Sequence, residues 1–177
     1  GIGIHPEGAY EFGEPQADGG NMDLIANNKS SVIPFYESPN SGDIDVNPGN
    51  SNDNYAQIVF GWIQPAETGD YRFYLAVDDN AELYLSTDDS PANSQLIAVE
   101  DNWTGIRTFL NREEKDNELE DGDVGTTSNA ISLVAGQRYY TEMIMSEGGG
   151  GDNAAVAWSF ASSGGTHERP ANGSHPI

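Results

Sequence analysis

The chain has no cysteine and few cationic residues, and each absence excludes a class of function. Without cysteine, its 177 residues can form neither a disulfide nor a thiolate nucleophile. Only 7 Lys and Arg stand against 29 Asp and Glu, which gives a formal net charge of −22. Binding to nucleic acid or to an anionic membrane requires clustered cations, so we expect neither partner.

Long hydrophobic runs are also missing. No stretch approaches the roughly 20 apolar residues of a membrane-spanning helix, and no signal peptide is recognisable, so we expect no membrane insertion. The 21 Gly and 9 Pro favour turns and short strands over long helices. The length fits one domain, and we expect residues 1–177 to form a monomeric module excised from a larger chain.

Motifs for nucleophilic catalysis are absent from the sequence. The three histidines, His5, His167 and His175, lie in terminal segments, and no GxSxG motif occurs. Carboxylates are plentiful, so a glycosidase-type pair stays open, but no spacing marks one. We therefore predict that the chain is not an enzyme.

Alternation of apolar and polar residues predicts an all-β fold. Residues 1–54 are loop-rich, whereas residues 55–177 carry the strand patterns. Strands are predicted over 55–65, 71–77, 81–87, 102–110, 154–160 and on both sides of the turn at 135–137. The connection PAETGD predicts that its flanking strands form a hairpin. The spacing is typical of an antiparallel β-sandwich or barrel with long loops.

Two adjacent carboxylates interrupt the strand pattern in AVDDNAELYL. Asp78 and Asp79 repel one another, and aspartate is depleted from strands. On an extended trans backbone their side chains would point to opposite faces. A cis peptide bond between them would direct both carboxylates towards one divalent cation.

The run SEGGGGDN is the second unusual stretch. Its glycines can adopt positive φ and expose their carbonyl oxygens, and Asp152 ends the run. Such a stretch is either a plain flexible loop or a calcium loop. Calcium takes six to eight oxygens, more than this loop supplies, and Asp78 and Asp79 could provide others.

Several segments together resemble one known family. They are AVDDNAELYLSTDDSPANSQLIA, NWTGIRTF, ISLVAGQRYYTEMIMSEGGGGDNAAVAWSF and ERPANGSHPI. In this order they resemble the PA-fourteen (PA14) domain, named for the anthrax protective antigen. The resemblance covers about residues 55–177, while residues 1–54 match only in being loop-rich. It implies an antiparallel β-sandwich or barrel.

The resemblance also implies a metal site. In lectin members such as yeast flocculins and bacterial adhesins, an Asp-cis-Asp pair and a later loop hold one Ca²⁺, and vicinal sugar hydroxyls complete its shell. Carried over by position, the calcium ligands are Asp78, Asp79, Asp152 and the carbonyls of Gly150 and Gly151. Gly149 stays possible because the glycine register is uncertain by one residue. The sugar would contact Asp78, Asp79, Asp152 and Gly149.

The same resemblance leaves the function open in one respect. The protective antigen's own domain is not a sugar lectin, so the fold alone does not imply sugar binding. The aspartate pair favours an extracellular, calcium-dependent lectin module of a large bacterial adhesin that binds mono- or oligosaccharides of cell-surface glycans. The alternatives are a targeting module of a secreted glycoside hydrolase and a structural spacer.

Other acidic and aromatic residues receive simpler interpretations. Glu82 is expected to be a solvated strand carboxylate, and Asp88 with Asp89 to form a turn. The three tryptophans, at 62, 103 and 158, are expected to pack in or beside the core, although Trp103 could stack on a sugar. Further calcium sites at Asp43/Asp45 or Asp121/Asp123 stay open, but neither segment forms a complete EF-hand loop.

Overall fold

The protein is built almost entirely of antiparallel strands. The computed structural model describes residues 5–12, 29–31, 36–37, 55–110, 125–174 and 176–177. Its strands are β1 His5–Phe12, β2 Lys29–Ser31, β3 Tyr55–Ile63, β4 Gly69–Asp78, β5 Asn80–Ser86, β6 Ser94–Glu100, β7 Ile131–Leu133, β8 Tyr139–Glu147 and β9 Asn153–Ala161. Helical structure in these residues is limited to the short turn η1, Pro91–Asn93. The predicted all-β antiparallel class is confirmed.

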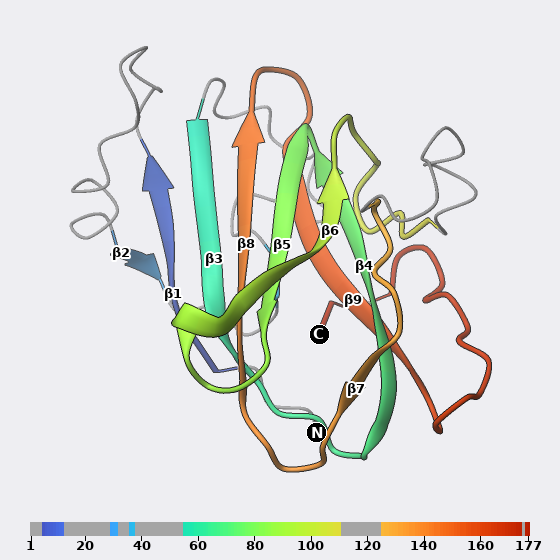
Figure 1. Cartoon of the computed structure of the whole chain (residues 1–177). Helices are drawn as coiled ribbons and strands as arrows, with labels where there is room; N and C mark the ends of the chain where they lie inside the picture. The colour runs from blue at the N-terminus through green and yellow to red at the C-terminus, as the bar shows by residue number, and fades with distance from the viewer. Residues whose placement is uncertain (1–4, 13–28, 32–35, 38–54, 111–124, 175) are drawn as a thin grey trace.

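The strands form two sheets that face one another (Figure 1). The larger sheet has the order β2-β1-β3-β8-β5-β6, and the smaller has the order β7-β4-β9. No helix within the described residues is long and apolar enough to cross a membrane.

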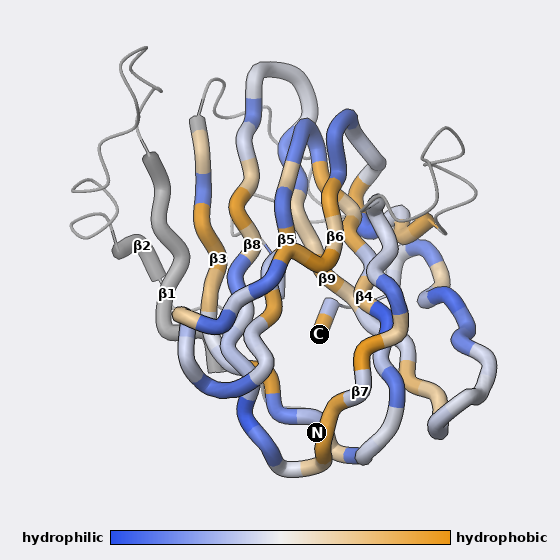
Figure 2. Tube along the Cα trace, viewed as in Figure 1, coloured by the Kyte–Doolittle hydropathy of each residue, from blue (hydrophilic) through white to orange (hydrophobic). Residues whose placement is uncertain are grey.

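The main core fills the space between the two sheets. Alternate residues of β8 point inwards, and Met143 and Met145 are fully buried, while Glu142 and Ile144 are only partly buried. Figure 2 shows the middle of β8 as hydrophobic and its upper end as hydrophilic. Burial, in contrast, alternates from residue to residue along residues 141–147. This period of two is what a sheet with one buried face requires.

Strand β4 is buried on both faces over its second half. Phe73 and Leu75 point into the main core, and Tyr74 and Ala76 belong to a second cluster with Phe109. The segment 104–110 therefore covers the outer face of β4. This explains why the segment 102–110 carries apolar residues such as Phe109 without forming a strand, and the predicted strand there is wrong.

Two connections cross from one sheet to the other at the same end of the molecule. The chain leaves the smaller sheet at the end of β4 and enters the larger one with β5 after a single intervening residue, Asp79. It returns through residues 148–152, between β8 and β9. Because β5 pairs with β8 and β4 pairs with β9, the two crossings lie side by side, at the top in Figure 1.

The predicted hairpin across PAETGD is wrong. Strand β3 pairs with β1 and β8, whereas β4 pairs with β7 and β9 in the other sheet. The short turn therefore links the two sheets and does not join neighbouring strands. Other strands lie where the sequence analysis expects none, among them β1, within the part expected to be loop-rich, and β6.

Candidate functional site

The two crossings bring together the acidic pair and the glycine-rich loop. Asp78 and Asn153 are paired across β4 and β9. The Gly148 N–H donates a hydrogen bond of 2.8 Å to Asp79 Oδ2. A Cβ atom on Gly151 would lie 2.9 Å from Asp78 Oδ2, so the loop packs directly on that carboxylate. Segments about 70 residues apart in the sequence thus form one site.

Three carboxylates converge at this site. Asp78, Asp79 and Glu147 each offer an oxygen, and these oxygens all lie within 4.8 Å of one another. The peptide bond between Asp78 and Asp79 is cis, as expected from the sequence. Both aspartates are partly exposed, whereas Glu147 is only 3% exposed. The cluster therefore has an open side and a buried floor.

The charges of the described residues that act on Glu147 all have the same sign. Burial, followed by the negative charges of Asp79, Asp152 and Asp78, raises the pKa of the Glu147 carboxyl from 4.5 to about 7. The Gly149 N–H opposes this shift of the pKa only in part. A carboxyl with these neighbours is stabilised either by a proton or by a cation.

The donor set of the site fits a hard divalent cation. Both Glu147 oxygens are buried, and neither accepts a well-formed hydrogen bond from the described residues. The same holds for Oδ1 of Asn153, whose amide nitrogen donates to the Thr104 carbonyl at 3.0 Å. Carboxylate, amide and carbonyl oxygens are the ligands that Ca²⁺ prefers. The oxygens present therefore suit calcium.

The other predicted ligands lie around the same cluster. Gly149, Gly150 and Gly151 are exposed, and Gly150 has a φ of 126°, a value that favours glycine. Asp152 is buried at 2% exposure and lies close enough for its charge to act on Glu147. The structure thus places every predicted ligand at one end of the sandwich, and their roles as ligands stay predictions.

Glu147 is the site residue that sequence reasoning missed. It comes directly before the glycine run, and no local pattern distinguishes its carboxylate from those of the many other acidic residues. The available signal was its register: Thr141, Met143 and Met145 face inwards, and Glu147 continues this series of every second residue. An acid at the inward position next to a candidate metal loop is unusual, because charged residues are rarely buried.

An exposed tryptophan stands beside the carboxylates. Trp103 forms an isolated antiparallel bridge with Asp78 and is 59% exposed, so the expectation that it packs in or beside the core is wrong. The next residue is tightly held. The Thr104 N–H donates to the Val77 carbonyl at 2.7 Å, and the Val77 N–H donates to Thr104 Oγ1 at 2.8 Å. The backbone that carries Trp103 is therefore fixed to the end of β4.

The remaining candidates take structural roles. Trp62 packs against Tyr140, and Trp158 packs against the main core, as expected. Glu82 is exposed on β5 and accepts a hydrogen bond from Tyr84.

The Asp88 carboxylate accepts from the Ser90 N–H at 2.9 Å, which confirms its place in a turn. The possible calcium sites at Asp43/Asp45 and Asp121/Asp123 lie outside the described residues.

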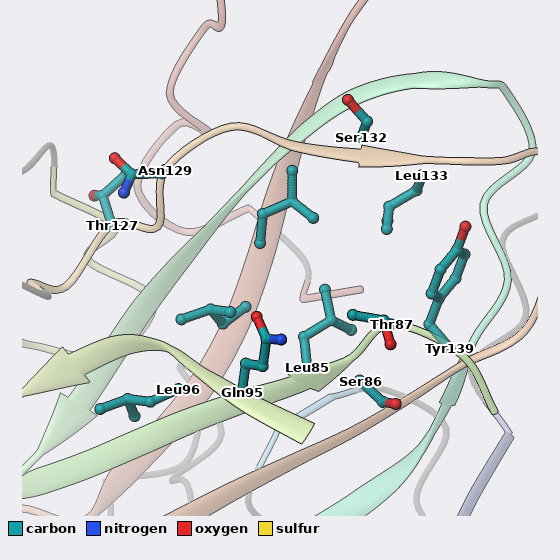
Figure 3. Close-up of a pocket in the computed structure, with 12 residues that line it drawn as sticks. Leu85, Ser86, Thr87, Gln95, Leu96, Thr127, Asn129, Ser132, Leu133 and Tyr139 are labelled. Atoms are coloured by element: carbon teal, nitrogen blue, oxygen red, sulfur yellow. The ribbon is translucent and has the colours of Figure 1, made fainter. Parts of the chain in front are cut away.

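A separate cavity lies at the open edge between the sheets. Figure 3 shows its lining, which includes Leu85, Gln95 and Leu96 on one side and Leu133 and Ser132 on the other. Its volume is about 310 Å³, and its walls come from β5, β6, β7, the first residue of β8 and the loops beside these strands. The lining contains no carboxylate, so this cavity has none of the chemistry of the acidic site.

Comparisons with known proteins place the chain in a family. The sequence model of the PA14 domain matches residues 32–172. A segment of 110 residues, 59% of this chain, is 34% identical to the mouse N-acetyl-beta-glucosaminyl-glycoprotein 4-beta-N-acetylgalactosaminyltransferase 1, and it spans 10% of that protein.

Solved structures share the fold. The PA14 sugar-binding domain from an RTX adhesin matches with a TM-score of 0.50 and 18% identity over 99% of this chain and 98% of that domain. An anti-sigma factor domain-containing protein matches with a TM-score of 0.51 and 17% identity over 98% of this chain and 47% of that chain. Because the family match extends over most of the sequence, the chain belongs to the PA14 domain family.

Proposed function

We propose that this domain binds carbohydrate through one calcium ion held between the Asp78-Asp79 pair and the glycine-rich loop. The observation that carries the proposal is the convergence of carboxylate oxygens within 4.8 Å of one another at a partly exposed end of the sandwich. The RTX adhesin domain with the same fold is described as sugar-binding, which supports carbohydrate as the ligand class.

Different residues would bind the ion and the sugar. The carboxylates of Asp78, Asp79 and Asp152 and the carbonyls of Gly150 and Gly151 would hold the ion. When bound, calcium supplies open coordination positions that two vicinal hydroxyls of a sugar can fill. The outward oxygens of Asp78 and Asp79 would accept hydrogen bonds from those hydroxyls. Specificity would then come from the surrounding side chains.

The setting of the domain is part of the proposal. We propose an extracellular, non-catalytic module that binds mono- or oligosaccharides of cell-surface glycans, as part of a large adhesin. The match to an adhesin domain over nearly its whole length supports this context. A second candidate is a targeting module attached to a carbohydrate-active enzyme, and the partial match to a mouse glycosyltransferase favours it. Both candidates require the same binding site.

The test is binding to a glycan array with calcium and with chelator. Wild-type protein should bind in calcium and lose binding in chelator. Asp79→Asn should bind neither calcium nor glycan, because it removes a ligand charge while keeping the size of the side chain. Asp89→Asn is the matched control, since Asp89 is exposed in the bend that follows β5, at the end of the strand away from the site. Glycan binding that survives chelation would remove calcium from the account, and unchanged binding by Asp79→Asn would remove the site.

A further inference from the structure

We propose that Glu147 is itself a calcium ligand and forms the buried floor of the metal site. This inference rests on the proposed function, because it concerns the same ion. It assigns to the site a carboxylate on strand β8, in addition to the aspartate pair and the loop.

The position of Glu147 on β8 is the first ground for this assignment. It is the last residue of the strand and follows the inward series of Thr141, Met143 and Met145. Its side chain therefore enters the end of the space between the sheets, below the two crossings. There it meets Asp78 and Asp79 with oxygens no more than 4.8 Å apart. An ion at this place would touch all three carboxylates.

The second ground is that the Glu147 carboxylate lacks good partners. Its oxygens are buried without a well-formed hydrogen bond from the described residues. The charged neighbours that act on it are three aspartates. A buried carboxylate among like charges destabilises the fold unless something compensates for its charge. A divalent cation coordinated by the cluster removes this cost.

The third ground is the coordination number of calcium. Three aspartates and two glycine carbonyls supply five oxygens if each contributes one, whereas calcium takes six to eight. Two sugar hydroxyls on the outer side bring the number to seven. An oxygen from Glu147 on the inner, buried side would bring it to eight, which is still within the range that calcium accommodates.

The experiment compares wild type, Glu147→Gln and Glu142→Gln. Glu142 lies on the same strand, but its side chain points to the outer face of the sheet and accepts a hydrogen bond from Tyr140 at 2.9 Å. This control therefore removes one negative charge from β8 without changing the face that carries the site. Calcium affinity is measured by titration calorimetry on chelator-treated protein. Terbium luminescence lifetimes in H₂O and D₂O then count the water molecules bound to the metal.

The expected results form a specific combination. Glu147→Gln should weaken calcium binding by at least about tenfold, because ligand charge sets affinity at such sites. It should add one coordinated water to bound terbium. At a pH above 7, where the Glu147 carboxyl is ionised, it should also raise the melting temperature of the calcium-free protein, because one of the repelling charges is gone. Glu142→Gln should produce none of these changes.

The possible failures can be told apart. If wild type binds neither metal, both the proposed function and this inference fall. If wild type binds calcium and Glu147→Gln has the same affinity and hydration number, only the assignment of Glu147 falls. A crystal structure with calcium gives a reading that needs no variant: a Glu147 oxygen within about 2.3–2.6 Å of the ion is expected. An ion in the cluster with Glu147 outside its shell would overturn the assignment.

Discussion

At the scale of single residues, the site depends on like charges that the fold holds together. Asp78, Asp79 and Glu147 approach one another from a crossing and a strand end. Asp152 adds a fourth carboxylate whose charge reaches Glu147. Under the proposed function, this grouping would disfavour the calcium-free state and favour the occupied one. The same residues would then set both the affinity for a cation and the stability without it.

The raised pKa of Glu147 makes the calcium-free protein sensitive to pH. The folded carboxyl titrates at about 7, above its ordinary value of 4.5. Between these values the folded protein holds a proton that the unfolded chain has released, so stability falls as pH rises through this window. From pH 5.5 to 7.5 the free energy of unfolding should drop by at most about 2 kcal/mol. The drop is smaller if solvent at the open side of the cluster screens the charges.

Thermal melts in chelator at the two pH values check this expectation. Glu147→Gln should remove most of the pH dependence, because the neutral amide does not titrate. A wild-type stability that rises over this range, or a variant with undiminished dependence, would contradict the account of Glu147.

Trp103 is the residue beside the site with the most exposed apolar surface. Its bridge to Asp78 and the hydrogen bonds of Thr104 fix its backbone next to the carboxylates. A ring in this position can pack on the apolar face of a sugar. Trp103→Ala should weaken glycan binding by about fivefold, roughly 1 kcal/mol, and leave calcium affinity unchanged.

Calorimetry with calcium and array binding at saturating calcium separate the two effects. Val134→Ala is the control, since Val134 is 50% exposed at the opposite end of β8. Equal glycan binding by wild type and Trp103→Ala would exclude a role for this ring.

At the scale of elements, the crossings between sheets create the site. Strands β5 and β8 are neighbours in one sheet, and β4 and β9 are neighbours in the other. Their links must therefore meet at one end. The glycine-rich link can lie close to the aspartates because Gly151 has no side chain. A Cβ atom at this position would collide with the carboxylate of Asp78.

Substitution of Gly151 tests this close approach. In Gly151→Ala the new Cβ would stand 2.9 Å from Asp78 Oδ2 and displace that carboxylate, so calcium affinity should fall by about tenfold. Gly164→Ala is the control, because Gly164 has a φ of 75° with nothing within 4 Å of its Cβ position. The control should lose some stability and retain calcium binding. Equal calcium affinities in the two variants would show that the approach does not matter.

The alternation of residues predicted most of the strands, because period two is a local property. It identified β3, β4, β5, β8 and β9. It could not show which strands pair, since the PAETGD turn is short enough for a hairpin and yet joins two sheets. It also predicted a strand over 102–110, which is wrong. Phe109 is apolar there because it packs over Tyr74 and Ala76 and not because it belongs to a sheet.

The site shows the same division between local and long-range information. The Asp78-Asp79 pair and the glycine run are unusual in the sequence itself. The resemblance to PA14 domains predicted that the two segments meet at one site. The place of Glu147 depends on register between sheets, which no local pattern contains. The exposure of Trp103 is likewise a feature of the tertiary structure that the local pattern does not contain.

At the scale of the whole molecule, the net charge of −22 acts alongside the site. Self-repulsion destabilises the compact state, and salt screens it. Sodium chloride should therefore raise the melting temperature of wild type and Asp79→Asn alike. Calcium should add a further stabilisation in wild type only, about 2.7 kcal/mol at 100 times its dissociation constant.

Melting curves at constant ionic strength separate the general and the specific effects. Magnesium serves as the control, because it prefers a tighter octahedral shell that retains waters. Equal stabilisation of both proteins by calcium, or of wild type by both cations, would indicate charge screening without a selective site.

The most direct measurement is a crystal structure of the protein soaked with calcium and a panel of methyl glycosides. The account predicts a single ion in contact with Asp78, Asp79 and the glycine-rich loop, with two neighbouring sugar hydroxyls bound to it on the open side. An empty cluster under saturating calcium, or a sugar bound away from the ion, would contradict it.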